Sequence, residues 1–115
     1  MDDRDRGRAR LDEIAPEFLG RPGVGFGRMF GSDGLSIRGK FFAFTAHTGD
    51  LVVKLDRDRI GELGLDNMVM RGRAMAEWAV VPLAESADRW RAVAEEGLAF
   101  VDSITPGAAD DAPTA

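Results

Sequence analysis

Apolar residues follow a helical spacing near both ends of this chain and a strand-like spacing between them, which constrains the fold more than any other feature. The first helical set is Leu11, Ile14, Ala15, Phe18 and Leu19. Their steps of three and four residues place them on one face of a helix that Pro16 interrupts. The spacing returns after Ser86, a predicted N-cap, in a closing helix that Trp90 anchors. The pattern therefore predicts an α+β fold, in which helices flank an antiparallel sheet.

Short apolar runs between the helices predict a meander of antiparallel strands. In the first run, side chains alternate with glycines, which is typical of a strand whose glycine face lies against a closely packed neighbour. Ser32-Asp33-Gly34 is expected to form a hairpin turn, and Arg38-Gly39-Lys40 to turn or bulge the second strand. The predicted strands are 24–30, 35–46 and 51–55.

A short helix and a second group of strands follow the meander. Asp56 is a suitable N-cap for a helix through Leu63, with Gly64 at its end. Strands at 67–71 and 75–81 are expected to pair across Gly72-Arg73 and to extend the sheet.

Length and composition are those of one globular domain without covalent cross-links. The chain has 115 residues, of which 44% are apolar and 30% charged, and it contains no cysteine. A chain of this size can bury roughly two-thirds of its unfolded surface, so a single core is expected. We predict one domain over residues 1–104, and a disordered tail rich in Ala, Asp and Pro over residues 105–115.

The distribution of charge argues against membranes and polyanions as partners. The N-terminal residues are charged, and no apolar run approaches the ~20 residues of a membrane span, so a cytoplasmic protein is expected. The net charge is −5, and leaving out Asp102, Asp110 and Asp111 near the C-terminus gives a body of −2. Such a body attracts nucleic acid weakly, and no autonomous nucleic-acid binding is predicted.

The sequence indicates no catalytic, cofactor-binding or metal-binding residues. The closely spaced glycines from Gly23 to Gly31 do not match a phosphate-binding loop, and they are better explained as a thin sheet face against a helix. His47 is the only histidine, so a metal site would need carboxylates alone, and Asp50, Asp56 and Asp58 are explained as turn and cap residues. No serine lies in a nucleophile-elbow motif. We therefore expect a protein without enzymatic activity and without a cofactor.

Two arginines are the candidates for contacting a partner. Basic residues occur in steps of two along the chain, and most of them lie beside aspartates, which is typical of a solvated face of mixed charge. Arg71 and Arg73 lack such nearby acids. They are the predicted partner-binding residues.

An ordered set of short motifs resembles the N-terminal domain of the TfoX/Sxy family over residues 10–104. The first motifs are Arg28-Met29-Phe30-Gly31, Gly34-Leu35, Gly39-Lys40-Phe41-Phe42-Ala43 and Leu51-Val52-Val53-Lys54. The later ones are Gly72-Arg73-Ala74-Met75 with Trp78, then Trp90, then Gly97-Leu98-Ala99-Phe100-Val101-Asp102-Ser103. Ala74 replaces a proline common in the family. The resemblance implies an α-β(3)-α-β(2)-α order, in agreement with the periodicity.

The founding members of that family regulate natural competence genes and carry a second, C-terminal domain. The resemblance therefore implies a non-enzymatic regulatory or adaptor domain that binds an unidentified protein. One alternative is a small-ligand or catalytic domain using a pocket between the glycine-rich strand and the helices. Another, by fold analogy, is a homodimeric, chaperone-like binding module. An adaptor needs an apolar patch or a free sheet edge, whereas an enzyme needs convergent polar groups in a cleft.

Overall fold

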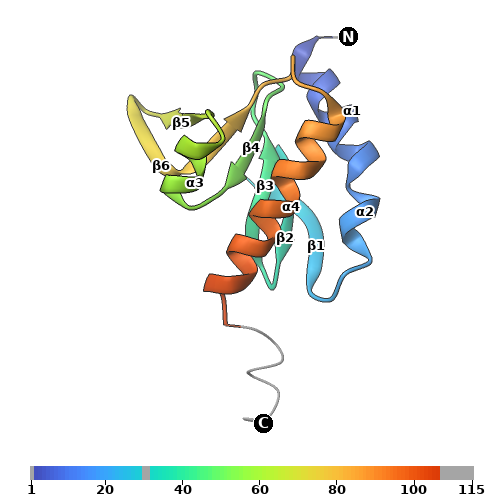
Figure 1. Cartoon of the computed structure of the whole chain (residues 1–115). Helices are drawn as coiled ribbons and strands as arrows, with labels where there is room; N and C mark the ends of the chain where they lie inside the picture. Colours follow the sequence, from blue (N-terminus) through green and yellow to red (C-terminus); the bar gives the residue numbers. More distant parts are fainter. Residues whose placement is uncertain (1, 30–31, 107–115) are drawn as a thin grey trace.

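Four helices and six strands make up the part of the chain that the computed structural model describes, residues 2–29 and 32–106. The helices are α1 (Asp3–Ile14), α2 (Pro16–Leu19), α3 (Arg57–Glu62) and α4 (Ala87–Ile104). The strands are β1 (Val24–Met29), β2 (Ser32–Ile37), β3 (Lys40–Thr45), β4 (Leu51–Lys54), β5 (Asp66–Met70) and β6 (Arg73–Val81). All pairings are antiparallel, in the order β1-β2-β3-β4-β6-β5. The predicted fold class, an α+β domain with an antiparallel sheet and flanking helices, is confirmed (Figure 1).

The N-terminal helix begins earlier than its apolar pattern indicates and restarts at the proline. Asp2 caps α1 by accepting a hydrogen bond from the Asp5 backbone N–H, so the charged residues before Leu11 are also helical. Pro16 is the first residue of α2, a position where its missing N–H costs no hydrogen bond.

The meander contains one strand more than the predicted order. Arg38 and Gly39 both have positive φ, 48° and 83°, and form a complete hairpin turn that divides the predicted second strand into β2 and β3. Ser32-Asp33-Gly34 lies within β2, so the hairpin turn predicted there is wrong. Gly34 serves close strand packing instead, because a Cβ at this position would lie 2.9 Å from the Phe44 Cβ. Phe30, predicted to end the first strand, lies outside the described residues.

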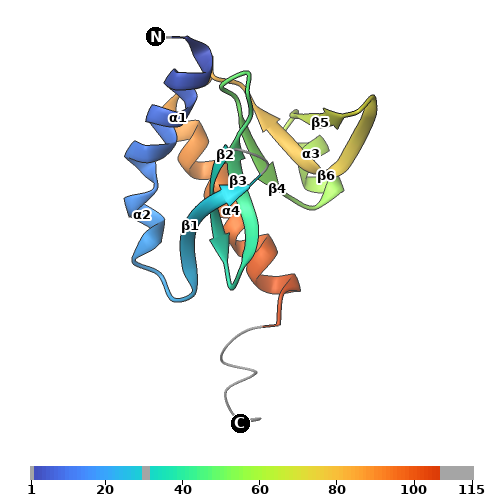
Figure 2. The same ribbon diagram turned by 180° about the vertical axis from the view of Figure 1, so that it is seen from behind.

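The main core lies between one face of the sheet and the helices. Figure 1 shows α4 lying across the sheet with α1 and α2 beside it, and Figure 2 shows the opposite face, where strands lie in front. Trp90 and Phe42 are the largest fully buried side chains, both 0% exposed. A shift in the β2–β3 register at Leu35/Ser36 leaves Phe42 as the extra residue of a β-bulge. The bulge allows both Phe42 and Ala43 to join the core.

The glycines of β1 at positions 25 and 27 are not required by close packing, whereas some glycines elsewhere in the chain are. An added Cβ at Gly25 or Gly27 would meet only the Ser36 Oγ at 3.6 Å or a Phe41 ring carbon at 3.9 Å, both ordinary contacts. The predicted thin face of β1 against a helix is therefore wrong. Gly97 does need to be small, because a Cβ there would lie 2.3 Å from the Val53 Cγ1.

The second half of the chain joins the sheet through β6, which lies between β4 and β5. Asp56 and Ser86 cap α3 and α4 as predicted, by accepting hydrogen bonds from the backbone N–H groups of Asp58 and Arg89. Of the predicted tail, Thr105 and Pro106 are described, and residues 107–115 lie outside the described part. Within the described ranges, no helix is long and apolar enough to cross a membrane.

Candidate functional site

The β5–β6 hairpin carries both predicted partner-binding residues at its turn. The turn consists of Arg71 and Gly72, with φ of 53° and 76°, one residue earlier than the predicted Gly72-Arg73. Positive φ at both central residues is the requirement of a two-residue type I′ hairpin. Arg73 is thus the first residue of β6 and pairs with Met70 across the turn.

β5 is an edge strand, and its outer side has no backbone partner among residues 2–29 and 32–106. In a two-residue hairpin the residues flanking the turn bond to each other, and the next residue points its N–H and C=O away. Val69 is that residue in β5, and its side chain is 63% exposed. The outer edge of β5 therefore offers backbone hydrogen bonds beside an exposed apolar side chain.

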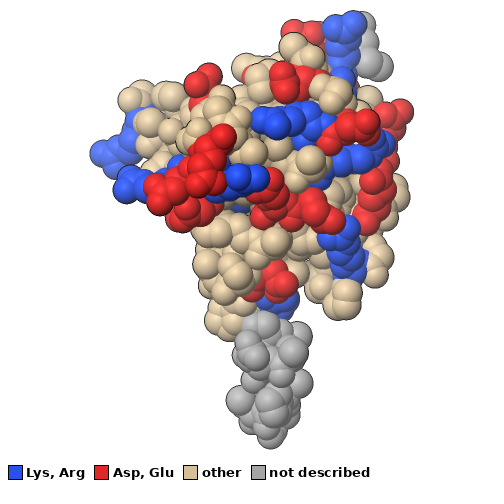
Figure 3. All heavy atoms as spheres, viewed as in Figure 1, with Lys and Arg blue, Asp and Glu red and all other residues tan. Residues whose placement is uncertain are grey.

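Arg71 and Arg73 are exposed, and no acid in the described part of the chain pairs with either of them. In Figure 3, basic side chains lie at the projecting end of this hairpin, whereas the middle of the same view mixes both signs. Unpaired guanidinium groups keep their full hydrogen-bonding capacity for an anion on a partner. The hairpin is therefore the candidate site.

Several other arginines form ion pairs with acids, some of them on distant segments. Arg59 donates to Glu96 of α4 at 2.7 Å and 3.0 Å and to Glu62 at 3.1 Å. These hydrogen bonds raise the pKa of Arg59 and lower that of Glu96. Arg91 bonds Glu17 and Asp88 in the same way, and its pKa is raised. The mixed-charge face predicted from sequence consists largely of pairs that hold elements together.

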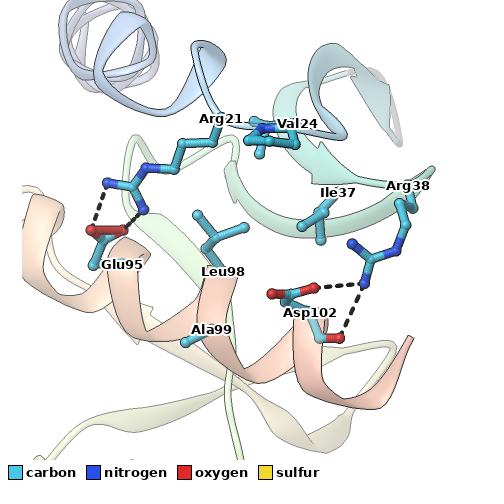
Figure 4. Close-up of a pocket in the computed structure, with 9 residues that line it drawn as sticks. Arg21, Val24, Ile37, Arg38, Glu95, Leu98, Ala99 and Asp102 are labelled. Atoms are coloured by element: carbon cyan, nitrogen blue, oxygen red, sulfur yellow. Dashed lines mark hydrogen bonds and ion pairs between the residues drawn. The ribbon is translucent and has the colours of Figure 1, made fainter. Parts of the chain in front are cut away.

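A hollow of about 460 Å³ lies beside the start of the glycine-rich strand, where the alternative reading expects a pocket (Figure 4). Its floor is apolar, with Val24, Ile37 and Leu98 among the lining residues. Arg21 forms a two-pronged ion pair with Glu95 on one side, through both Nη1 and Nη2. This hydrogen bonding raises the pKa of Arg21.

Arg38 lies on the other side of this hollow and closes the end of α4. Its guanidinium donates to the Asp102 carboxylate at 2.7 Å and to the carbonyl oxygens of Asp102, Thr105 and Pro106. The last carbonyl oxygens of a helix have no hydrogen-bond donor within the helix, and the Arg38 guanidinium supplies donors for them. The charged groups of this hollow thus bond one another or the backbone.

The residues that the sequence explains as surface, turn and cap residues have such roles in the structure. His47 is exposed in the turn between β3 and β4. Asp50 accepts a hydrogen bond from the Leu83 N–H at 2.8 Å, and Asp56 caps α3. Among the residues described, no group of three His, Asp or Glu side chains could hold a metal ion.

The sequence does not identify the edge position of β5, because strand order depends on pairings between distant segments. Asn67-Met68-Val69-Met70 lacks the alternation of apolar and polar residues that would have marked one exposed face.

A scan against protein-family models finds no matching family, and a search of curated proteins finds no matching relative.

Proposed function

We propose that this chain is a non-enzymatic regulatory or adaptor domain that binds an extended, acidic segment of a partner protein through the β5–β6 hairpin. The single observation that carries the proposal is the location of two unpaired arginines at the end of a free edge strand. The resemblance to the N-terminal domain of the TfoX/Sxy family points to the same class of function.

Backbone pairing would supply much of the affinity. A partner segment that aligns with β5 gains hydrogen bonds from the outward-facing groups of Val69 and covers its exposed side chain. Acidic side chains at one end of that segment would meet Arg71 and Arg73, which fixes its direction along the edge. Because these charges are exposed, we expect the affinity to fall with rising salt.

The hollow beside β1 supports a small-ligand or catalytic role less well. Arg21 and Arg38 are already bonded to Glu95 and Asp102, so an anionic ligand would have to break an existing pair. These contacts also hold α4 against the start of β1 and the end of β2.

The proposal can be tested with a fluorescein-labelled peptide of alternating aspartate and valine, compared with its lysine counterpart by fluorescence anisotropy. We expect the acidic peptide alone to bind. Arg71→Asn and Arg73→Gln should each weaken binding about three- to tenfold, as expected for one solvent-exposed hydrogen bond. Asparagine is chosen at Arg71 because it tolerates positive φ.

Val69→Pro tests the role of the edge. Proline removes an N–H that points outward, so the β5–β6 ladder should survive while strand addition fails. Arg6→Gln on α1 is the matched control and should bind as the parent protein does. Equal binding of the lysine peptide or of duplex DNA, or unimpaired binding by Val69→Pro, would overturn the proposal. A dimer that Val69→Pro dissociates would replace the acidic segment by a second copy of this chain.

A further inference from the structure

A second hollow, of about 420 Å³, lies where the last turns of α4 meet the start of β3 and the end of β4. Phe41 and Trp78 supply aromatic walls, and Val101 and Ile104 supply aliphatic ones. It shares no residue with the β5–β6 turn or with the hollow beside β1. A volume in this range suits a small organic ligand.

The indole of Trp78 is held in place yet remains partly exposed. The Phe44 ring packs against it edge-on, with ring centroids 5.5 Å apart and an interplanar angle of 66°. The Lys54 ammonium lies 5.1 Å from the centre of the Trp78 ring, close enough for a cation–π contact. A ring fixed by its neighbours can receive a second planar group with little further loss of conformational freedom.

The same hollow carries more positive than negative charge. Lys40 and Lys54 both line it, and the only acid that pairs with either in the described part of the chain is Glu77, 3.4 Å from the Lys54 Nζ. Lys40 at the start of β3 is exposed and has no acidic partner in residues 2–29 and 32–106. One ammonium group is therefore left over beside two aromatic walls.

We propose that this hollow binds a planar aromatic anion, such as an aromatic carboxylate or sulfonate. The ring of the ligand packs against Phe41 and Trp78, and its anionic group lies between the ammonium groups of Lys40 and Lys54. Lys54 already contacts the Trp78 ring, so its ammonium group lies beside one of the two rings against which the ligand would pack. The inference goes beyond the proposed adaptor function and does not depend on it.

The test is a titration of the ¹⁵N-labelled protein with 1-naphthoate, followed by NMR. We expect the largest shift changes at the backbone amides of Gly39–Phe41 and Lys54 and at the Trp78 indole N–H. Naphthalene-1-methanol, which keeps the ring without the charge, and acetate, which keeps the charge without the ring, should each bind at least about tenfold more weakly.

Lys40→Gln and Lys54→Gln should each weaken naphthoate binding about three- to tenfold, and Arg6→Gln should leave it unchanged. Lys40 is exposed and Lys54 is partly exposed, so these variants should fold, and their spectra away from the hollow check this directly. Equal binding of naphthoate and the uncharged alcohol, or shift changes concentrated elsewhere, would overturn the proposal. Loss of peptide binding by the hairpin variants would leave this result unaffected, so the two proposals fail separately.

Discussion

Trp90 combines complete burial with a satisfied indole N–H. The Nε1 donates to the Pro82 carbonyl at 3.1 Å, and the Arg10 guanidinium lies 4.7 Å from the ring centre. Removing a large buried aromatic side chain costs ~3–5 kcal/mol, against a total stability of about 5–15 kcal/mol for a small domain.

We therefore expect Trp90→Ala to lower the free energy of unfolding by ~3–5 kcal/mol, or to prevent folding. Trp90→Phe should cost less, about 1–3 kcal/mol, because it keeps most of the apolar surface and loses the bond to Pro82. Urea unfolding followed by far-ultraviolet circular dichroism measures both. A Trp90→Ala protein as stable as the parent would show that this side chain contributes little to the core.

Replacing glycine by alanine should have opposite effects on stability at Gly97 and at Gly61. Alanine normally stabilises a helix relative to glycine by about 1 kcal/mol. At Gly97 the new Cβ would meet Val53 at 2.3 Å and the Phe42 carbonyl oxygen at 3.2 Å, and at Gly61 in α3 it would meet nothing within 4 Å.

We expect Gly97→Ala to destabilise the protein by about 1–3 kcal/mol, because crowding of the fully buried Val53 outweighs helix propensity. Gly61→Ala should stabilise it by ~0.5–1 kcal/mol. Thermal or urea melts of the two variants provide the comparison. An increase in stability for Gly97→Ala would mean that α4 shifts away from β4 at little cost.

At the scale of elements, local signals in the sequence identify the helices well. The caps at Asp56 and Ser86 are predicted because a capping side chain bonds a backbone N–H only two or three residues away. The position of β6 between β4 and β5 is not predicted, because it follows from packing between segments far apart in the chain. At Arg38-Gly39-Lys40 the sequence predicts a turn or a bulge without deciding between them, because arginine rarely adopts the positive φ that the complete hairpin turn requires.

In the candidate site, too, local features can be predicted from the sequence and contacts between distant segments cannot. The lack of nearby acids in the sequence correctly predicts that Arg71 and Arg73 form no ion pair within the described residues. Their sequence neighbours are also their structural neighbours in a tight hairpin. The pairing of Arg59 with Glu96 is not readable in this way, because it joins α3 to α4 across 37 positions of the sequence.

The Arg59–Glu96 pair predicts how stability should depend on pH. Hydrogen bonds from Arg59 lower the pKa of Glu96 in the folded protein, so the carboxylate stabilises the fold above its ordinary pKa of about 4.3. This contribution is lost as the pH falls through the lowered pKa. Because the Glu96 side chain is 36% exposed, the contribution is that of a partly solvated pair.

Glu96→Gln should lower the melting temperature by about 1–5 °C at neutral pH, and the difference from the parent should vanish as the pH falls below the lowered pKa of Glu96. Glu13→Gln is the control, since Glu13 is exposed on α1 and has no partner in the described residues. Calorimetric scans over this pH range give both curves. A difference that stays constant down to the lowest pH would mean that the Glu96→Gln substitution acts through packing and not through charge.

For the whole molecule, the two proposed binding regions share no residue, although Trp78 of the aromatic hollow lies on β6, the strand that pairs with β5. The helices cover one face of the sheet, the free edge lies at β5, and the aromatic hollow lies at the last turns of α4 (Figure 1). The two proposals therefore concern different residues, and we expect a protein segment and a small anion to be able to bind at the same time.

The position of β6 also bears on how fast the chain can fold. Pairing of β4 with β6 is the one ladder of the described sheet between strands that do not follow each other in sequence, whereas every other ladder is a local hairpin. Local hairpins close quickly, but joining β4 to β6 must first enclose α3 and β5 in a loop, at an entropic cost that no contact offsets until the loop is closed. We therefore expect docking of β6 on β4 to be slow compared with closure of the hairpins, so substitutions along this ladder should slow folding more than those in the hairpin turns.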